Sequence, residues 1–441
     1  MKYDKFFAIA KEKGIEESEL RVSTSYALNI SLFHGEISQY TVEDGSSYTA
    51  RGIFNGKFGS ASSDVYNYKK AEFLVDEIVN NAKVIQNEDP AILFKGSEKY
   101  HKINTFSKTL GEISIDKKIE TLFALEKRLK EIDSRIVEVE GVDYSEDVTS
   151  ISIFNSHGLK LTQKLNYYYL SGAVVAKENE QVKTAYEIKI GNDFSEVNVD
   201  ELAHTIVNKA LAQLGGEPCK SKKYKAVLAP EVMAAFASVY VDHASAESVQ
   251  KQSSLFIGKV GQSVASKKVT IEDKPLQKGN VFSRWFDDEG VATYNKAIIK
   301  KGVLQGYLYS LTTAAKDGVT STGNGARHGS KIGVEPFALY LKPGKKSQEE
   351  LFKKVKDGVY ITEVQGLHAG MNGQSGNFSL QSTGFLIKDG KLDKGLDVIT
   401  ISGNLVDVMN DIVEVGADSK ILLGGNTFSS VIVKKLAVGG K

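Results

Sequence analysis

The pattern of hydrophobic and polar positions predicts the same series of elements twice in the first half of the chain. Apolar residues recur at helical spacing in four segments, Tyr3 to Lys13, Ala71 to Ile85, Lys117 to Ile132 and Asp200 to Leu214. Alternating runs, typical of half-buried strands, lie between the first two segments and again between the last two. The predicted order is therefore helix, antiparallel strands, helix, followed by a second copy.

Short sequence similarities support this internal repeat. Ile30 to Phe33 resembles Ile151 to Phe154, and a His-Gly pair follows closely in both places. Asn55-Gly56 predicts a tight hairpin between two strands of the first copy. The polar segment Asn87 to Asp116 is expected to connect the copies. Because each helix must bury its apolar face on a sheet, the predicted fold class is α+β.

A domain boundary is predicted near residue 220. Two glycines at 215 and 216 end a helix, Pro218 prevents its continuation, and a charged run extends to Lys223. We therefore assign residues 1–220 to an α+β domain built from the two helix–sheet–helix units. Residues 221–441 are assigned to a mainly β, barrel-like domain with one long helix.

Strand patterns dominate the second half of the chain, and helical patterns are few. The long helix is expected from Pro230 to about Phe256, and shorter helices from Ser347 to Asp357 and from Leu405 to Glu414. Ser347 and Glu350 have the spacing of a capping box, which predicts a helix start. The expected strands include Lys268 to Ile271, Val303 to Tyr309, Phe337 to Leu341, Gly384 to Ile387, Val398 to Ile401 and Val431 to Ala437.

Composition restricts the class of protein. Lys+Arg 56 and Asp+Glu 55 leave a net charge of +1, so no overall field attracts nucleic acid or an anionic membrane. The single cysteine, Cys219, cannot form an internal disulfide, which fits a reducing compartment. An acidic residue comes early and no long apolar run follows, so neither a signal peptide nor a membrane span is expected. We expect a cytoplasmic protein.

A segment rich in glycine, serine and asparagine is the first candidate for a binding site. It runs from Gly366 to Ser379, contains His368, and lies between an expected strand and an alternating run. Glycine permits positive φ and close approach of another molecule to the backbone. The segment is therefore typical of a loop that touches a ligand or another chain, although a surface loop with several tight turns has the same composition.

The motifs of several enzyme classes are missing from the sequence. None of the seven histidines belongs to an H-E-x-x-H motif, and the chain has neither a G-x-S-x-G elbow, nor a Walker A sequence, nor a dinucleotide fingerprint. Cys219 lies in a lysine-rich segment that could lower its pKa, but we interpret its position there as incidental.

Two other loops could bind ions. Ser321 to Gly329 could hold an anion with backbone amides and Arg327, but we favour an ordinary strand connection because no helix follows. Asp287, Asp288 and Glu289 could bind a hard cation. Because consecutive side chains point in different directions, we favour a turn with a solvated acidic edge there.

The long helix offers one further metal candidate. It carries Asp242, His243 and Glu247, and the last two have the i, i+4 spacing of residues on one helical face. That spacing suits two metal ligands, but it equally suits an ordinary helical charge pair, which we favour.

Taken in order, the motifs of the second half resemble the TldD/PmbA family, and within it the PmbA (TldE) branch. The resemblance covers nearly the whole chain, although the first half matches mainly through its helix–sheet–helix order. The matching segments are Ser254 to Gly261, Phe286 to Thr293, Gly302 to Leu308, Ser321 to Asn324, Gly366 to Gly370, Ser375 to Ser379, Ile401 to Leu405 and Val415-Gly416.

This resemblance implies a zinc-dependent peptidase system of two related subunits, acting on unfolded or short peptides. The TldD-type subunit is expected to hold zinc with an H-E-x-x-x-H helix and a later cysteine, whereas the PmbA-type subunit lacks these ligands. In this chain the motif positions fall on Ala237, Ser238 and Asp242, and Gly424-Gly425 stands near the expected cysteine. None of the alanine, serine and glycine residues can replace an imidazole or thiolate ligand.

The resemblance therefore implies a PmbA/TldE-like subunit that binds no metal itself and pairs with a TldD-type zinc peptidase. His368, Asn372 and Ser375 are its expected peptide contacts. Two alternatives remain: a stand-alone metallopeptidase with a different metal site, and a non-catalytic, peptide-binding homodimer. The family also carries the label modulator of DNA gyrase, but the neutral charge balance does not support direct DNA binding.

Overall fold

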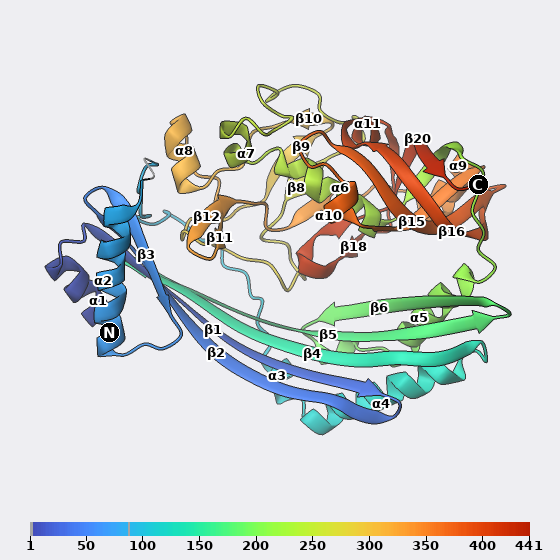
Figure 1. Ribbon diagram of the computed structural model, residues 1–441, viewed down its shortest axis with the longest axis horizontal. Coiled ribbons are helices and arrows are strands. Elements are labelled where there is room, and N and C mark those ends of the chain that lie inside the picture. Colours follow the sequence, from blue (N-terminus) through green and yellow to red (C-terminus); the bar gives the residue numbers. More distant parts are fainter. Residues whose placement is uncertain (1–2, 87–88) are drawn as a thin grey trace.

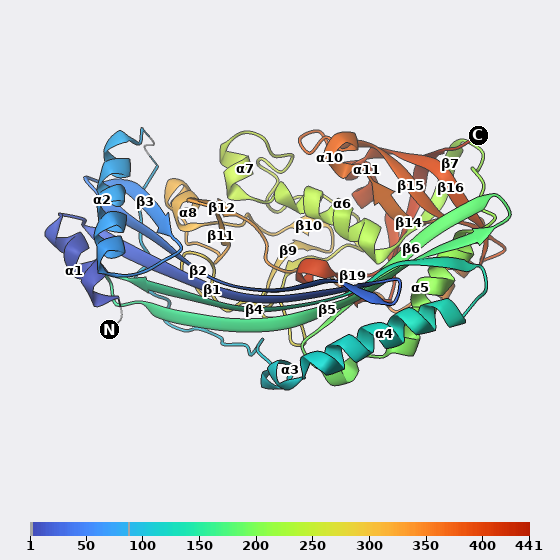
Figure 2. The same cartoon turned by 60° about the horizontal axis from the view of Figure 1, so that its bottom comes forward.

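The computed structural model describes residues 3–86 and 89–441. Residues 1–2 and 87–88 lie outside this part, and with them the first positions of the amino-terminal segment and of the expected Asn87 to Asp116 connection. A long, curved antiparallel sheet forms the first half, and the second half lies over one face of it (Figures 1 and 2). No helix in the described ranges combines the length and apolar character needed to cross a membrane.

The predicted repeat is confirmed. Each copy consists of a helix, three antiparallel strands and a second helix, and the copies are joined by a connection that includes the short α3 (Lys108–Glu112). The first copy comprises α1 (Asp4–Glu12), β1 (Glu17–Phe33), β2 (Glu36–Phe54), β3 (Lys57–Ser63) and α2 (Tyr68–Val84). The second comprises α4 (Ile115–Glu131), β4 (Ile136–Asn155), β5 (Lys160–Glu178), β6 (Gln181–Gly191), the 3₁₀ turn Phe194–Glu196 and α5 (Val199–Gln213).

The two copies share one continuous sheet. The strand order is β3-β2-β1-β4-β5-β6, so the first strands of the two copies pair at its centre. The hairpin predicted at Asn55-Gly56 joins β2 to β3, and both residues have positive φ, as a type I′ turn requires. Central pairing explains how two helix–sheet–helix units form a single layer.

All four long helices of the repeats cover the same face of this sheet. Alternate residues of β1 point to one face, and there Leu20 and Val22 pack against α1 and α2. Farther along the strand, Leu28, Ile30 and Leu32 pack against α4 and α5. The other face is left to the second half, where Ile153 and Leu161 meet Trp285 and Phe286, among others.

The second half contains a barrel of five strands, as expected for a mainly β domain. The strands pair in the order β16-β15-β14-β7-β20, and β16 also pairs with β20 to close the barrel. The pairings include one parallel pair, β7 with β14. The barrel strands are β7 (Lys222–Leu228), β14 (Gly358–Gln365), β15 (Asn377–Lys388), β16 (Lys391–Asn404) and β20 (Val431–Gly439), with β17 (Ile412–Val415) beside β20.

A second, more irregular sheet and several short helices complete this half. The sheet has the order β10-β9-β8-β13-β19-β18, and a separate hairpin is formed by β11 (Gly325–His328) and β12 (Lys331–Val334). The sheet strands are β8 (Ile271–Asp273), β9 (Lys296–Lys300), β10 (Val303–Leu304), β13 (Leu339–Leu341), β18 (Lys420–Ile421) and β19 (Thr427–Phe428). The helices are α6 (Pro230–Asp242), α7 (Ala246–Gln250), α8 (Leu311–Asp317), α9 (Gln348–Val355), α10 (Leu367–Gly370), α11 (Leu405–Asn410) and the 3₁₀ turn Leu423–Gly425.

The predicted long helix is wrong in its length. It ends at Asp242 instead of continuing to about Phe256, and a separate short helix, α7, follows. The chain turns at Ala244 because that residue accepts a backbone hydrogen bond from Leu308, while Ala246 donates one to Leu308. Tertiary backbone pairing therefore replaces the helical pattern that the local sequence favours.

Three other predicted elements also differ. The helix expected from Leu405 to Glu414 stops at Asn410, because the residues after it pair with β20 as β17. The strand expected from Lys268 begins only at Ile271, where it can pair with Leu341. The strand expected from Val303 to Tyr309 pairs regularly only over its first two residues. In each case a distant partner sets the boundary.

The capping box of α9 is confirmed and gives a stability prediction. Ser347 accepts a hydrogen bond from the backbone of Glu350, whose side chain accepts one from the backbone of Ser347. Ser347→Ala is therefore expected to lower the free energy of unfolding by about 1 kcal/mol. Urea unfolding measures this change. Ser46→Ala, whose hydroxyl caps no helix, is the control, and an equal loss in both variants would contradict a capping role.

Candidate functional site

The expected metal-binding positions lie on α6, and their side chains do not form a metal site. Ala237 is completely buried in the core of the second half. Ser238 is exposed and donates a hydrogen bond of 2.8 Å from its hydroxyl to the carbonyl of Ala234. Asp242 is exposed at the end of the helix. One methyl group, one hydroxyl already bonded to its own helix and one carboxylate do not fit the ligand set of a zinc ion.

The alternative metal site at Asp242, His243 and Glu247 loses its geometric basis. His243 caps α6 and Glu247 belongs to α7, so the two do not share a helical face. The Nδ1 atom of His243 accepts a hydrogen bond from the backbone of Leu255, and Glu247 pairs with Lys251 as a helical charge pair. In the described ranges no group of three or more His, Cys, Asp or Glu residues is placed to hold a metal ion.

The glycine-rich segment forms a short helical turn, α10, followed by a tight loop that returns the chain into β15. His368 and Asn372 are exposed, and the Asn372 side chain accepts hydrogen bonds from the backbones of Gln374 and Ser375 at 3.0 and 2.9 Å. The Ser375 hydroxyl accepts from the backbone of Asn377 at 3.3 Å. Two of the three expected peptide contacts therefore also stabilise the loop, whereas His368 leaves its imidazole available to solvent.

This loop lies against α6, so the two candidate regions come together. The rings of Phe236 on α6 and Phe378 on β15 are 4.9 Å apart between centroids. His243, buried at the end of α6, lies near the backbone of Gly373. Burial lowers the pKa of His243, while Asp242 and the Gly373 backbone act in the opposite direction. The structure thus places the exposed part of the loop beside the helix that carries Ser238 and Asp242.

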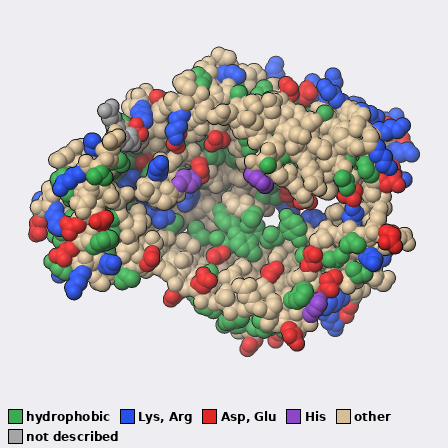
Figure 3. All heavy atoms as spheres, in the orientation of Figure 1, with side chains coloured by type: hydrophobic (Ala, Val, Ile, Leu, Met, Phe, Trp, Pro, Cys, Tyr) green, Lys and Arg blue, Asp and Glu red, His purple; other side chains and the backbone are tan. Residues whose placement is uncertain are grey.

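The space between the sheet and the second half is hollowed, and hydrophobic side chains gather in it (Figure 3). On the face of β5 that points to the second half, Tyr167 and Tyr169 are partly exposed, and the Tyr167 ring lies 4.9 Å from that of Phe282. Burial raises the pKa of both tyrosines, so their hydroxyls stay protonated at neutral pH. The hydroxyls bond to each other, that of Tyr167 also bonds to Asp147, and the rings suit contact with an extended polypeptide.

The acidic run is buried, so the expectation of a solvated acidic edge is wrong. Asp287 accepts hydrogen bonds from the backbones of Glu289, Val291 and Gly325, each between 2.8 and 2.9 Å. Asp288 lies 3.6 Å from both Arg21 on β1 and Arg284. The carboxylates of this acidic run are buried at the contact between the sheet and the second half, which we call the seam. Their partners come from both sides of it.

Arg327 belongs to the same seam. The segment Ser321 to Gly329 is a strand connection that leads into β11, as favoured from the sequence. The Arg327 side chain is 6% exposed and lies 3.5 Å from Glu19, which also pairs with Arg51 at 2.7 Å. Sequence reasoning missed Glu19 and Arg51. The only local signal for them is a charge at alternate positions of otherwise half-buried strands.

Cys219 is also buried. It is 6% exposed, and its backbone carbonyl accepts a hydrogen bond from Lys441 at the end of the chain. The terminal residues lie against its backbone.

Comparison with known proteins identifies the family. Three domain descriptions of the PmbA/TldA metallopeptidases match: domain 1 over residues 18–82, the central domain over residues 108–214 and the C-terminal domain over residues 221–440. A metalloprotease of Methanocaldococcus jannaschii is 29% identical over 419 residues, with 92% of this chain and 91% of the relative covered. The family includes proteins named as zinc metalloproteases.

Solved structures agree with this result. A Thermotoga maritima protein described as a candidate modulator of a DNA gyrase is 30% identical, with a TM-score of 0.92 and 99% of both chains covered. TldE from Thermococcus kodakarensis, at 24% identity, has the same fold, with a TM-score of 0.92 and 100% of both chains covered. The chain belongs to the PmbA/TldD metallopeptidase family.

Proposed function

We propose that this protein is a PmbA/TldE-type subunit that works with a TldD-type zinc peptidase on unfolded or short peptides. In this proposal the partner supplies the zinc ion and its activated water, and this chain helps to enclose the peptide. The side chains at the α6 motif positions carry the proposal, because Ala237 is buried in the core and Ser238 is bonded to its own helix. Neither can hold a metal ion.

The loop beside α6 is the proposed place of peptide contact. His368 offers an exposed imidazole, while Asn372 and Ser375 hold the loop in shape and present its backbone. Extended peptides bind well to such backbone groups, because strand-like hydrogen bonds do not depend on sequence. The partly exposed tyrosines of β5 would add aromatic contacts in the hollow.

Co-expression with a TldD-type relative tests this function. We expect the two chains to co-purify as a dimer, with zinc in proportion to the partner only, and we expect peptide cleavage by the pair. His368→Ala is expected to leave the dimer intact and to raise the KM for peptides by about tenfold, as loss of one polar contact in a binding site does.

The same experiment separates the alternatives. Stoichiometric zinc and cleavage by this chain alone would favour a stand-alone metallopeptidase and contradict the proposal. A stable homodimer that binds peptides and excludes every TldD-type partner would favour the non-catalytic peptide binder.

A further inference from the structure

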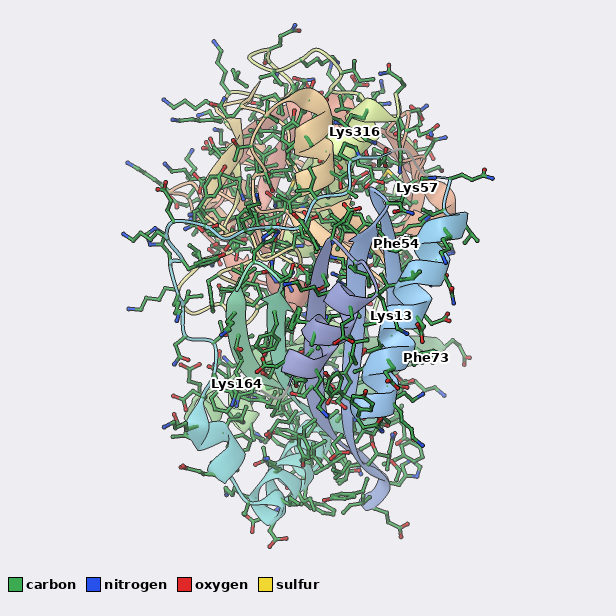
Figure 4. The ribbon with its side chains drawn as sticks, turned by 90° about the vertical axis from the view of Figure 1, so that its left-hand side faces the viewer. Lys13, Phe54, Lys57, Phe73, Lys164 and Lys316 are labelled. Atoms are coloured by element: carbon green, nitrogen blue, oxygen red, sulfur yellow. The ribbon has the colours of Figure 1, made fainter. Side chains whose placement is uncertain are left out.

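A pocket of about 600 Å³ lies at the seam between the first and second halves, on the side of β3 and α8. Figure 4 labels Lys316 on α8, which lines the pocket, and Lys57 at the start of β3, the strand that supplies Phe58 to the same pocket. Its volume falls within the range of small-ligand sites. Its walls come from β3, the segment around Pro90, α7, α8 and the β11–β12 hairpin.

Two buried charged residues, Arg51 and Glu289, line this pocket. The Nε and Nη2 atoms of Arg51 donate to the carboxylate of Glu19 at 2.7 and 3.3 Å. The Oε2 atom of Glu289 accepts from the backbone of Leu311 at 2.7 Å. Among the described residues, Nη1 of Arg51 and Oε1 of Glu289 have no hydrogen-bond partner, so each residue keeps one polar atom for a ligand.

Four arginines and four carboxylates, Glu19, Asp287, Asp288 and Glu289, lie together behind the pocket. Glu19 bridges two guanidinium groups, those of Arg51 and Arg327. Asp288 likewise bridges two, those of Arg21 and Arg284. Among the described residues, the four arginines therefore form their ion pairs with only two of these carboxylates, because Asp287 and Glu289 accept backbone hydrogen bonds instead.

Arg327 is left incompletely paired in this arrangement. Its Nε and Nη1 atoms are buried without a hydrogen-bond partner in the part of the chain that the structure describes. Burial and the neighbouring Arg51 lower the pKa of Arg327 to about 10. An additional negative group near Arg51 would compensate this charge.

We propose that the seam pocket binds the free carboxylate at the C-terminus of a peptide, with Arg51 as its cationic partner and Glu289 as a hydrogen-bond donor. This inference rests on the proposed function, because it names the part of the peptide that this subunit recognises. The apolar walls formed by Phe58, Pro90 and Ile332 suit the side chain of a terminal residue.

Glu289 must carry a proton to donate this bond, and its surroundings determine when it does. Burial raises the pKa of Glu289, and Glu19 acts in the same direction, whereas Arg51, Arg327 and the Leu311 backbone lower it. The pKa of the adjacent Asp287 is also raised well above its usual range, first by burial and then by Glu289. The other charged or titratable groups of the pocket are Asp89, Glu247, Lys251, Lys316, His328 and Lys331.

The sign of the pH effect follows from this arrangement. A carboxylate entering the pocket brings a second negative charge toward Glu289, which raises the pKa of Glu289 further and favours proton uptake. Affinity for the free acid should therefore rise as pH falls toward about 6, by at most about tenfold per pH unit.

Calorimetry on the purified full chain tests the proposal with one short, N-acetylated peptide prepared as free acid and as carboxamide. The acid is expected to bind at least about tenfold more tightly than the amide, as a charge-assisted pair requires. Buffers of different ionisation enthalpy should show proton uptake on binding of the acid. In Glu289→Gln, preference for the acid should remain while proton uptake and pH dependence disappear.

A second carboxylate variant serves as the control for proton uptake. Glu272→Gln removes a partly buried carboxylate that pairs with Lys274, and neither residue lines the pocket, so proton uptake should persist in that variant. Equal affinity for acid and amide, no binding of either, or unchanged proton uptake in Glu289→Gln would overturn the proposal. Inorganic phosphate serves as a competing anion. If phosphate displaces the peptide as effectively as a free-acid peptide does, the proposal that the ligand is a carboxylate is overturned. Failure to pair with a TldD-type subunit would instead contradict only the proposed function.

Discussion

Replacing Glu19 by alanine is expected to lower the stability of the seam by about 3–5 kcal/mol, because this change leaves two buried guanidinium groups without their shared carboxylate. Glu19 is completely buried, and it pairs with Arg51 on the neighbouring strand and with Arg327 from the second half. Removing one member of a buried ion network costs much more than the network contributes, since the remaining charges stay desolvated.

The only tryptophan of the chain reports this change directly. Trp285 is buried at the seam and packs against Phe286 and Tyr100, so its fluorescence should respond when the two halves separate. In urea, Glu19→Ala should lose the Trp285 signal at a clearly lower concentration than the unmodified chain. The matched control is Asp76→Ala, which removes an exposed pair with Lys13 and should cost less than about 1 kcal/mol. Equal midpoints for the two variants would show that the seam does not depend on Glu19.

Introducing the H-E-x-x-x-H motif that the sequence comparison led us to expect on α6 should destabilise the protein without creating a zinc site. Ala237→His places an imidazole at a completely buried position that lies in the core of the second half. Overpacking of a core costs about 1–3 kcal/mol, and an imidazole without a partner adds about 1–3 kcal/mol. Adding Ser238→Glu and Asp242→His completes the motif but does not supply the missing cysteine ligand.

Urea unfolding and zinc analysis of the purified variants check this prediction. Ser238→His is the control, because this exposed position on the same helix should accept an imidazole at a cost within about 0.5 kcal/mol. Stoichiometric zinc in the triple variant, at unchanged stability, would show that the position still faces a metal site and would weaken the proposal of a partner subunit.

Much of the fold follows from local sequence patterns. The four helices of the repeats, the hairpin at Asn55-Gly56 and the capped helix after Ser347 all appear where periodicity and turn residues predict them. These signals are reliable because the interactions behind them, an apolar face or a cap, involve residues close in the chain. The end of α6 could not be predicted in this way, because Leu308 determines it through backbone pairing from a distant segment.

The sequence by itself determined the repeated α+β architecture and the family resemblance, and it places alanine and serine at positions 237 and 238. Only the tertiary structure decided that the acidic run is buried in an ion network and that a pocket opens beside Arg51 and Glu289. The physical reason is sequence separation, since Glu19 meets Arg327 across 308 positions. A charge on a half-buried strand has the same local pattern whether it faces water or a partner, and the fold alone brings that partner.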